Sequence, residues 1–175
     1  MNSDMKKFKT FDSFSFSSNL LNNINSKWFM ITAGNLDLYN MMTASWGMFG
    51  ILWNKPVAEI FVRNTRYTHN FMEKNDYFSL SFFDEDYRNI LDLVGSKSGR
   101  DFDKMAIKNL TALSYENKTV YFEEANEVLI CKKLLAYPLH KDLLPEQINK
   151  NFYNTFNEEH HTAFYGEIIQ YLKKV

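Results

Sequence analysis

The amino-acid sequence predicts a mainly β fold, an antiparallel barrel with short helical insertions. About seven segments of the chain show the apolar runs or the period-two alternation of β-strands. Most of these segments are joined by short turns, as in hairpins, and the regular strand–helix alternation of a parallel doubly wound sheet is missing. The 175 residues contain no internal repeat and no composition break, so one barrel domain is expected.

The first hairpin of the predicted barrel lies at residues 28–46. An apolar run at 28–34 stops at Gly34, turn-forming residues follow, and the chain resumes a strand at 40–46. A short helix at 18–25 is expected before this hairpin, because its apolar residues recur at helical spacing.

The middle of the chain is expected to place one helix between two strands. Alternating apolar and polar residues predict a strand at 57–63. Asn64 or Thr65 is expected to cap a helix at 66–74, since either side chain can accept a hydrogen bond from a free amide of the first turn. An apolar run at 77–83 predicts the next strand.

The second half continues with helices and then strands. Apolar residues at helical spacing up to Val94 predict a helix that Gly95 ends. A polar loop and a short helix at 101–110 follow. The segment 119–137 is predicted to form a hairpin, and 163–174 the closing strand.

Composition and charge limit the possible partners. A net charge of -1 without long runs of one sign argues against nucleic acid and acidic membrane surfaces. No apolar stretch is long enough to span a bilayer and no secretory signal is evident, so a soluble cytoplasmic protein is expected. The single cysteine, Cys131, excludes an internal disulfide framework. The high aromatic content, 17%, indicates either an unusually aromatic core or a large apolar interface or pocket.

Common nucleotide and metal motifs are missing from the sequence. No GxGxxG follows a strand, and no GxxxxGK[ST] is present. Residues 141–160 are polar and are expected to be irregular. The EEHH segment at 158–161 sets two carboxylates beside two imidazoles, but adjacent loop residues rarely converge on one ion, so no metal site is predicted.

A group of polar residues is predicted to form a phosphate receptor. The group combines hydroxyls, an amide and two guanidinium groups near the start of the helix at 66–74, where free backbone amides favour anions. Solvated surface arginines are the alternative interpretation. The residues are Asn40, Thr43, Ser45, Arg63, Thr65, Arg66 and Thr68.

Four stretches, in the same order, resemble the flavin reductase-like family. They are WFMITAG through YFSLSFF at 28–83, SGRDFDK at 98–104, YFEEANEVLICKKL at 121–134 and HTAFYGEI at 161–168. The resemblance implies an FMN-binding split β-barrel of antiparallel Greek-key type. It further implies a barrel domain at 26–175 after an N-terminal extension with a short helix at 1–25.

The resemblance also implies roles for individual residues. The strand at 40–46 would lie along the isoalloxazine ring and the ribityl chain. Lys104 would reach the phosphate or close its loop. His161 would stand where the nicotinamide enters and is the catalytic candidate. Phe164 and Tyr165, before Gly166, depart from the family pattern, and a bulky aromatic side chain there is expected to narrow that entrance. The implied cofactor-binding residues are Asn40, Met41, Met42, Thr43, Ala44, Ser45, Trp46, Arg63, Thr65, Arg66, Thr68 and Lys104.

The implied function is an NAD(P)H-dependent flavin reductase. Hydride would pass from NADH or NADPH to N5 of FMN, and the protein would be a homodimer with FMN between its subunits. A flavoredoxin-like electron carrier, without a nicotinamide site and served by a redox protein partner, is the first alternative. A split barrel that binds no flavin is the second.

Overall fold

The computed structural model describes residues 7–16, 19–153 and 160–175. Its strands are β1 (Phe8–Phe11), β2 (Phe29–Asn35), β3 (Leu38–Ala44), β4 (Gly47–Leu52), β5 (Lys55–Arg63), β6 (Tyr77–Phe82), β7 (Ala112–Tyr115), β8 (Thr119–Phe122), β9 (Glu127–Pro138) and β10 (His161–Lys174). Its helices are α1 (Leu20–Asn22), which continues as a π-helical turn η3 (Asn23–Lys27), α2 (Tyr67–Lys74), α3 (Arg88–Ser96) and α4 (Glu146–Phe152). Short 3-10 turns are η2 (Ser13–Ser15), η4 (Glu85–Tyr87), η5 (Lys104–Ala106) and η6 (Lys141–Leu143).

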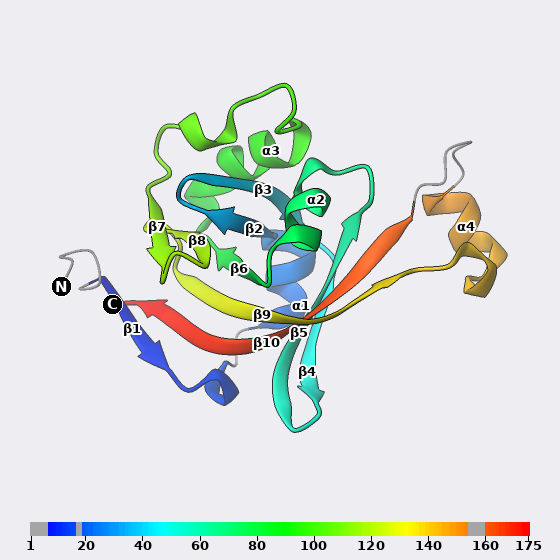
Figure 1. The fold of residues 1–175 in the computed structure, drawn as a ribbon, viewed down its shortest axis with the longest axis horizontal. Coiled ribbons are helices and arrows are strands. Elements are labelled where there is room, and N and C mark those ends of the chain that lie inside the picture. Colours follow the sequence, from blue (N-terminus) through cyan, green and yellow to red (C-terminus); the bar gives the residue numbers. More distant parts are fainter. Residues whose placement is uncertain (1–6, 17–18, 154–159) are drawn as a thin grey trace.

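One curled antiparallel sheet organises the fold (Figure 1). Its strand order is β3-β2-β6-β9-β10-β5-β4, and β1 pairs with the C-terminal end of β10. The two edge strands, β3 and β4, are joined by Ser45 and Trp46 alone. Because so short a link connects opposite edges, the sheet must curl until those edges approach each other. The result is a barrel with a split beside the β3–β4 link.

Two hydrophobic cores lie on opposite faces of β2 and β3. Phe29 and Ile31 belong to the core inside the barrel, and Met30 belongs to a second core with residues of α3 and the β7–β8 hairpin. These three side chains are fully buried, each contributing about 1.5–3 kcal/mol of transfer free energy. Burial on both faces explains why the start of β2 is a continuous apolar run rather than an alternating one.

The predicted hairpin at 28–46 is present as β2 and β3, with a tight turn. Asn35 Oδ1 accepts hydrogen bonds from the amides of Asp37 and Leu38, at 3.1 and 3.2 Å. Gly34 has a φ of +107°, and a side chain there would meet the Leu38 carbonyl oxygen at 2.3 Å. This position therefore requires glycine.

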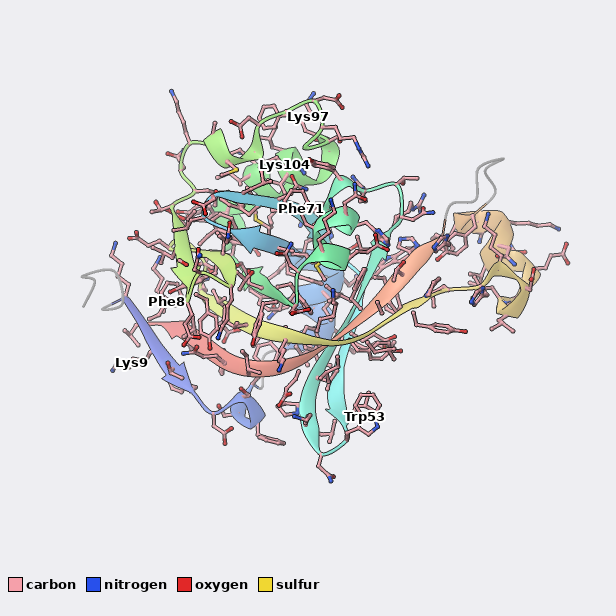
Figure 2. The ribbon with its side chains drawn as sticks, viewed as in Figure 1. Phe8, Lys9, Trp53, Phe71, Lys97 and Lys104 are labelled. Carbon is pink, nitrogen blue, oxygen red and sulfur yellow. The ribbon has the colours of Figure 1, made fainter. Side chains whose placement is uncertain are left out.

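The strand predicted at 40–46 ends at Ala44, and a strand that was not predicted, β4, begins at Gly47. β4 pairs with β5 through a two-residue turn at Trp53 and Asn54, whose φ angles are 51° and 58°. This turn lacks the glycine that usually marks such hairpins, so the sequence signal was weak. Figure 2 shows Trp53 at the tip of the hairpin, away from the barrel.

The predicted hairpin at 119–137 is wrong. β8 pairs with β7, which the sequence did not reveal, and β9 pairs with β6 and β10. The segment contains both strands, but the turn between them leads from the small β7–β8 sheet into the large sheet, so β8 and β9 are not paired with each other. Pattern alone identifies strands and does not fix their partners.

The helices differ in smaller ways from the predictions. The helix expected at 101–110 is reduced to η5, and part of the segment expected to be irregular forms α4. Neither predicted cap is used, because Arg66 occupies the N-cap of α2 without a side-chain hydrogen bond. β1 joins the sheet through β10, while the division of the chain at residue 25 stays a prediction.

A candidate anion-binding site in the split of the barrel

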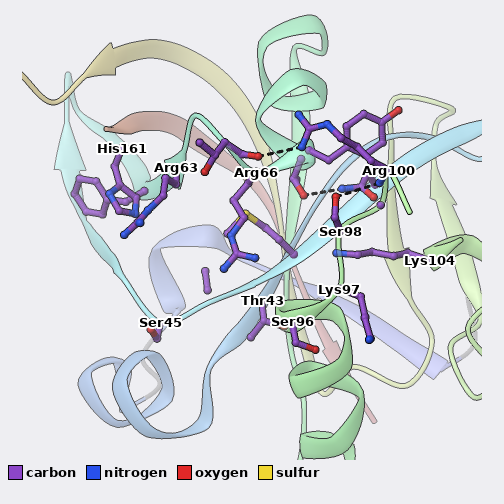
Figure 3. A pocket seen from close by; sticks show the side chains of 18 of the residues that line it. Thr43, Ser45, Arg63, Arg66, Ser96, Lys97, Ser98, Arg100, Lys104 and His161 are labelled. Atoms are coloured by element: carbon purple, nitrogen blue, oxygen red, sulfur yellow. Dashed lines mark hydrogen bonds between the residues drawn. The ribbon is translucent and has the colours of Figure 1, made fainter. Parts of the chain in front are cut away.

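A cavity of about 550 Å³ opens at the split of the barrel (Figure 3). Its walls are formed by β3 from Asn40 onward, the Ser45–Trp46 link, the end of β5, the start of α2, the segment after α3 and the start of β10. Arg63 and His161 come together because they are direct partners in the β5–β10 ladder. Strand pairing thus joins residues that are almost 100 positions apart.

All but one of the predicted site residues line this cavity. They are Asn40, Met42, Thr43, Ala44, Ser45, Trp46, Arg63, Thr65, Arg66, Thr68, Lys104 and His161. Met41 does not line it and is fully buried in the second core. Successive side chains of a strand point to opposite faces, so the side chain of Met41 faces α3 while Met42 faces the barrel.

The cavity is strongly positive. Its lining has no Asp or Glu among the described residues, although the whole chain has a net charge of -1. Cations gathered without carboxylates are a receptor for phosphate or a comparable anion. The basic lining residues are Arg63, Arg66, Lys97, Arg100 and Lys104.

Two arginines link the start of α2 to the region around the end of α3. Arg66 Nη1 donates to the carbonyl oxygen of Gly95 at 2.8 Å, and Arg100 Nη1 donates to that of Thr65 at 3.0 Å. The Arg100 guanidinium also lies over the Tyr67 ring, 5.0 Å from its centroid. These contacts hold both guanidinium groups at the cavity wall.

Lys104 is a buried cation behind the cavity. Its Nζ donates to the carbonyl oxygens of Met41 at 2.8 Å and Val94 at 2.7 Å, and the side chain is 5% exposed. Burial, and then the charge of Arg66, lowers the pKa of Lys104 to about 8. The amine is therefore charged at pH 7 and near its titration range.

The hydroxyl group of Thr43 donates its hydrogen bond to α3. Its Oγ1 donates to the carbonyl oxygen of Leu91 at 2.5 Å, and Gly95 packs closely against the same side chain. Toward the cavity Thr43 therefore offers hydroxyl lone pairs and main chain. The sequence predicted this residue as a ligand contact without revealing its bond to α3.

His161 is neutral at physiological pH. Burial, followed by the charges of Arg63, His160 and Arg66, lowers its pKa to about 4. Its Nδ1 forms a 2.8 Å hydrogen bond with the Tyr153 hydroxyl, and Trp46 lies against its ring at a centroid distance of 4.9 Å. His161 can orient a bound group by hydrogen bonding, but it carries no charge at pH 7.

Several lining residues were missed by the sequence reasoning. The end of α3 and the loop 97–100 were predicted without a role in the site, although the alternation of serine, glycine and basic residues there is a usable signal of an anion site. Phe61 and Tyr67 gave no signal, since aromatic residues are frequent throughout this chain. The missed residues are Phe61, Tyr67, Ser96, Lys97, Ser98, Gly99 and Arg100.

Two negative findings concern only the residues that the structure describes. Among them, no group of His, Cys, Asp and Glu side chains is arranged to hold a metal ion. Glu158 and Glu159 of the EEHH segment lie outside the described residues. Within the described ranges, no helix has both the length and the apolar character needed to cross a membrane.

The fold and the cavity define a split-barrel protein with a candidate site for an anionic ligand. The chain belongs to the flavin reductase-like family, because the profile of the flavin reductase like domain matches residues 21–173. The family resemblance and the split-barrel fold class predicted from the sequence are thereby confirmed. A comparison with curated protein sequences finds no match.

Solved structures share this fold at low sequence identity. The FMN-binding protein from Thermus thermophilus, with bound p-hydroxybenzaldehyde, is 18% identical, with a TM-score of 0.64 over 82% of this chain and 69% of that chain. Flavoredoxin from Methanosarcina acetivorans is 22% identical, with a TM-score of 0.64 over 83% and 67%. The NADH:FAD oxidoreductase of Streptomyces globisporus, in complex with NAD and FAD fragments, is 16% identical, with a TM-score of 0.60 over 85% and 80%.

Proposed function

We propose that this protein binds FMN and catalyses its reduction by NADH or NADPH. The observation that carries the proposal is the cavity itself. Five basic side chains line it near the end of β3, and none of the described Asp or Glu residues lines it. A negatively charged phosphate attached to a flat heterocycle matches that lining. When bound, FMN supplies the redox chemistry by accepting a hydride at N5.

The residues present fit the two parts of FMN. Arg63, Arg66 and Lys97 would bind the phosphate, with Lys104 adding positive charge from behind. The main chain from Thr43 to Trp46 would lie along the ring. Ser45 and Thr43 provide polar atoms there, and Trp46 offers an aromatic surface that is 40% exposed.

Two observations support a reductase with a nicotinamide site. Neutral His161 stands at the cavity wall, where a hydrogen bond would orient a carboxamide without repelling the cationic nicotinamide product. Phe164, expected to narrow the entrance, is instead fully buried in the barrel core and does not line the cavity. The likeness to flavoredoxin supports the alternative, an electron carrier that is reduced by a redox protein partner.

We further propose a homodimer with the cavity near the subunit interface. The β4–β5 hairpin exposes Met48, Ile51 and Trp53 by 54%, 62% and 62%. Exposed apolar side chains gathered on one hairpin are typical of an association surface. Light scattering at micromolar concentration is expected to give twice the mass of 20.7 kDa, and a monomer would contradict the proposal.

Anaerobic stopped-flow spectroscopy distinguishes the reductase from the carrier. The FMN-loaded protein is mixed with NADH, with NADPH or with a reduced ferredoxin, and flavin bleaching is followed near its visible absorption maximum. A reductase is bleached by at least one nicotinamide nucleotide. Bleaching by ferredoxin alone would support the electron carrier and refute the reductase.

A further inference from the structure

The loop 97–100 contacts β3 at a position where only glycine fits. A Cβ atom added to Gly99 would lie 2.1 Å from Asn40 Oδ1 and 2.9 Å from Tyr67 Cδ1. Both neighbours are held in place: Asn40 is 3% exposed and its Nδ2 donates to Thr68 Oγ1 at 2.7 Å, while Tyr67 begins α2. The main chain of Gly99 therefore sits directly against the Asn40 amide.

Space, and not backbone conformation, makes glycine necessary here. Gly34 is the glycine with a positive φ among the described residues, so Gly99 adopts a conformation that other residues also accept. The absence of a side chain at Gly99 allows the close approach to Asn40 and Tyr67. The contact therefore fixes the position of this loop against β3 and α2.

Other contacts hold the same loop in one conformation. Arg100 donates to the Thr65 carbonyl oxygen and stacks over Tyr67, as described above. Within the loop, the Ser98 hydroxyl accepts from the Arg100 amide at 3.2 Å, and the Ser98 carbonyl oxygen accepts from the Phe102 amide at 3.0 Å. These contacts tie the loop to α2 and to itself.

We propose that Asn40 and Gly99 are positioning residues that hold Lys97 and Arg100 at the cavity, and so determine the preference for phosphorylated over unphosphorylated flavin. This inference rests on the proposed flavin site. It changes the role of Asn40 from a direct cofactor contact to a support for the loop, because its amide already contacts Thr68 and Gly99. A loop ordered in advance binds an anion at lower entropic cost.

Titration of the wild type and Gly99→Ala with FMN and with riboflavin tests the preference. The added methyl pushes the loop away from Asn40, so FMN binding is expected to weaken about tenfold or more, while riboflavin binding changes less than about twofold. Gly50→Ala is the matched control, since a Cβ there meets nothing within 4 Å. Equal losses for both flavins, or no loss for either, would overturn the proposal.

Limited trypsin digestion of ligand-free protein provides a readout that needs no flavin. Cleavage after Lys97 is expected to be slow in the wild type and in Gly50→Ala, and about tenfold faster in Gly99→Ala. Arg100→Gln, which removes the bond to Thr65 without a steric push, is expected to expose Lys97 as well. Asn40→Ala/Gly99→Ala removes the closest clash, with Asn40 Oδ1, and leaves only the 2.9 Å approach to Tyr67 Cδ1, so cleavage is expected to be slower than in Gly99→Ala.

The two experiments fail in different ways. Wild-type protein that binds neither flavin would overturn the proposed function, while the digestion still tests the seating of the loop. Wild-type cleavage rates in both Gly99→Ala and Arg100→Gln would overturn the positioning role even if FMN binds.

Discussion

The Lys104 ammonium group donates a 2.8 Å hydrogen bond to the carbonyl oxygen of Met41, on the strand that forms the back of the cavity. The side chain of Met41 points into the second core, so this residue acts at the site through its main chain. A second bond from Lys104 to Val94 joins the same amine to α3. The buried ammonium group thus connects β3 to α3 and adds its positive charge to the cavity.

Anion affinity is predicted to depend on the protonation of Lys104. The pKa of about 8 means that the amine loses its charge as pH rises from 7 to 9.5, and a bound phosphate favours the charged form. FMN binding by the wild type should therefore weaken by up to about tenfold over this range. Titrations of Lys104→Met at the same pH values should show weaker binding at pH 7 and a nearly flat profile. A wild-type slope in Lys104→Met would contradict this role.

Arg66 is predicted to bind the phosphate of FMN. Replacing Arg66 with alanine should weaken FMN binding about 10- to 100-fold, since a charge-assisted hydrogen bond contributes about 1.5–3 kcal/mol. Riboflavin binding should change little, and isothermal titration measures both. Lys9→Ala is the control, because Lys9 lies on β1, far from Lys97 and Lys104 (Figure 2). A similar loss of riboflavin binding would show that Arg66 has only a structural role.

His161 is predicted to make the protein less stable in mild acid. Its pKa is lowered to about 4 in the folded state, so between pH 6.5 and 4 the unfolded chain binds the proton first and stability falls as pH falls. After allowance for solvent screening, the loss is about 1–2 kcal/mol. Urea unfolding at pH 7 and pH 4.5 should show a smaller loss for His161→Gln. Identical losses in both proteins would refute this assignment.

Gly166 is predicted to be essential for packing in the barrel. It lies at an irregularity in the β9–β10 pairing, and an added Cβ would meet Phe78 Cζ at 2.5 Å and Cys131 Cβ at 2.8 Å. Overpacking of this kind costs about 1–3 kcal/mol, so Gly166→Ala should lower the urea midpoint clearly. Gly50→Ala should leave the midpoint unchanged, and equal midpoints for all three proteins would contradict the packing.

The sequence predicted the elements of this fold better than their partners. The β2–β3 hairpin was recognisable because its apolar run, Gly34 and Asn35 all indicate the same turn. β4 was missed because its turn contains no glycine and half of its side chains face outward. The pairing of β8 with β7 depends on tertiary packing in the second core, which period-two patterns do not encode.

The candidate site was predicted mainly where its residues lie close together in the sequence. Residues close together in sequence, from Asn40 to Trp46 and from Arg63 to Thr68, were proposed as groups and line the cavity as groups. Met41 was predicted as a contact because it lies within the stretch that resembles the family, but strand alternation places its side chain opposite that of Met42, in the second core. The loop 97–100 was missed because its approach to Asn40 depends on a single glycine contact between distant segments.

Titration of ligand-free protein with FMN, followed by visible absorption and calorimetry, tests the central claim most directly. The positive cavity predicts one FMN per chain, micromolar or tighter binding as a rough scale, and about tenfold or weaker binding of riboflavin. Absence of FMN binding, or equal affinity for FMN and riboflavin, would contradict the account.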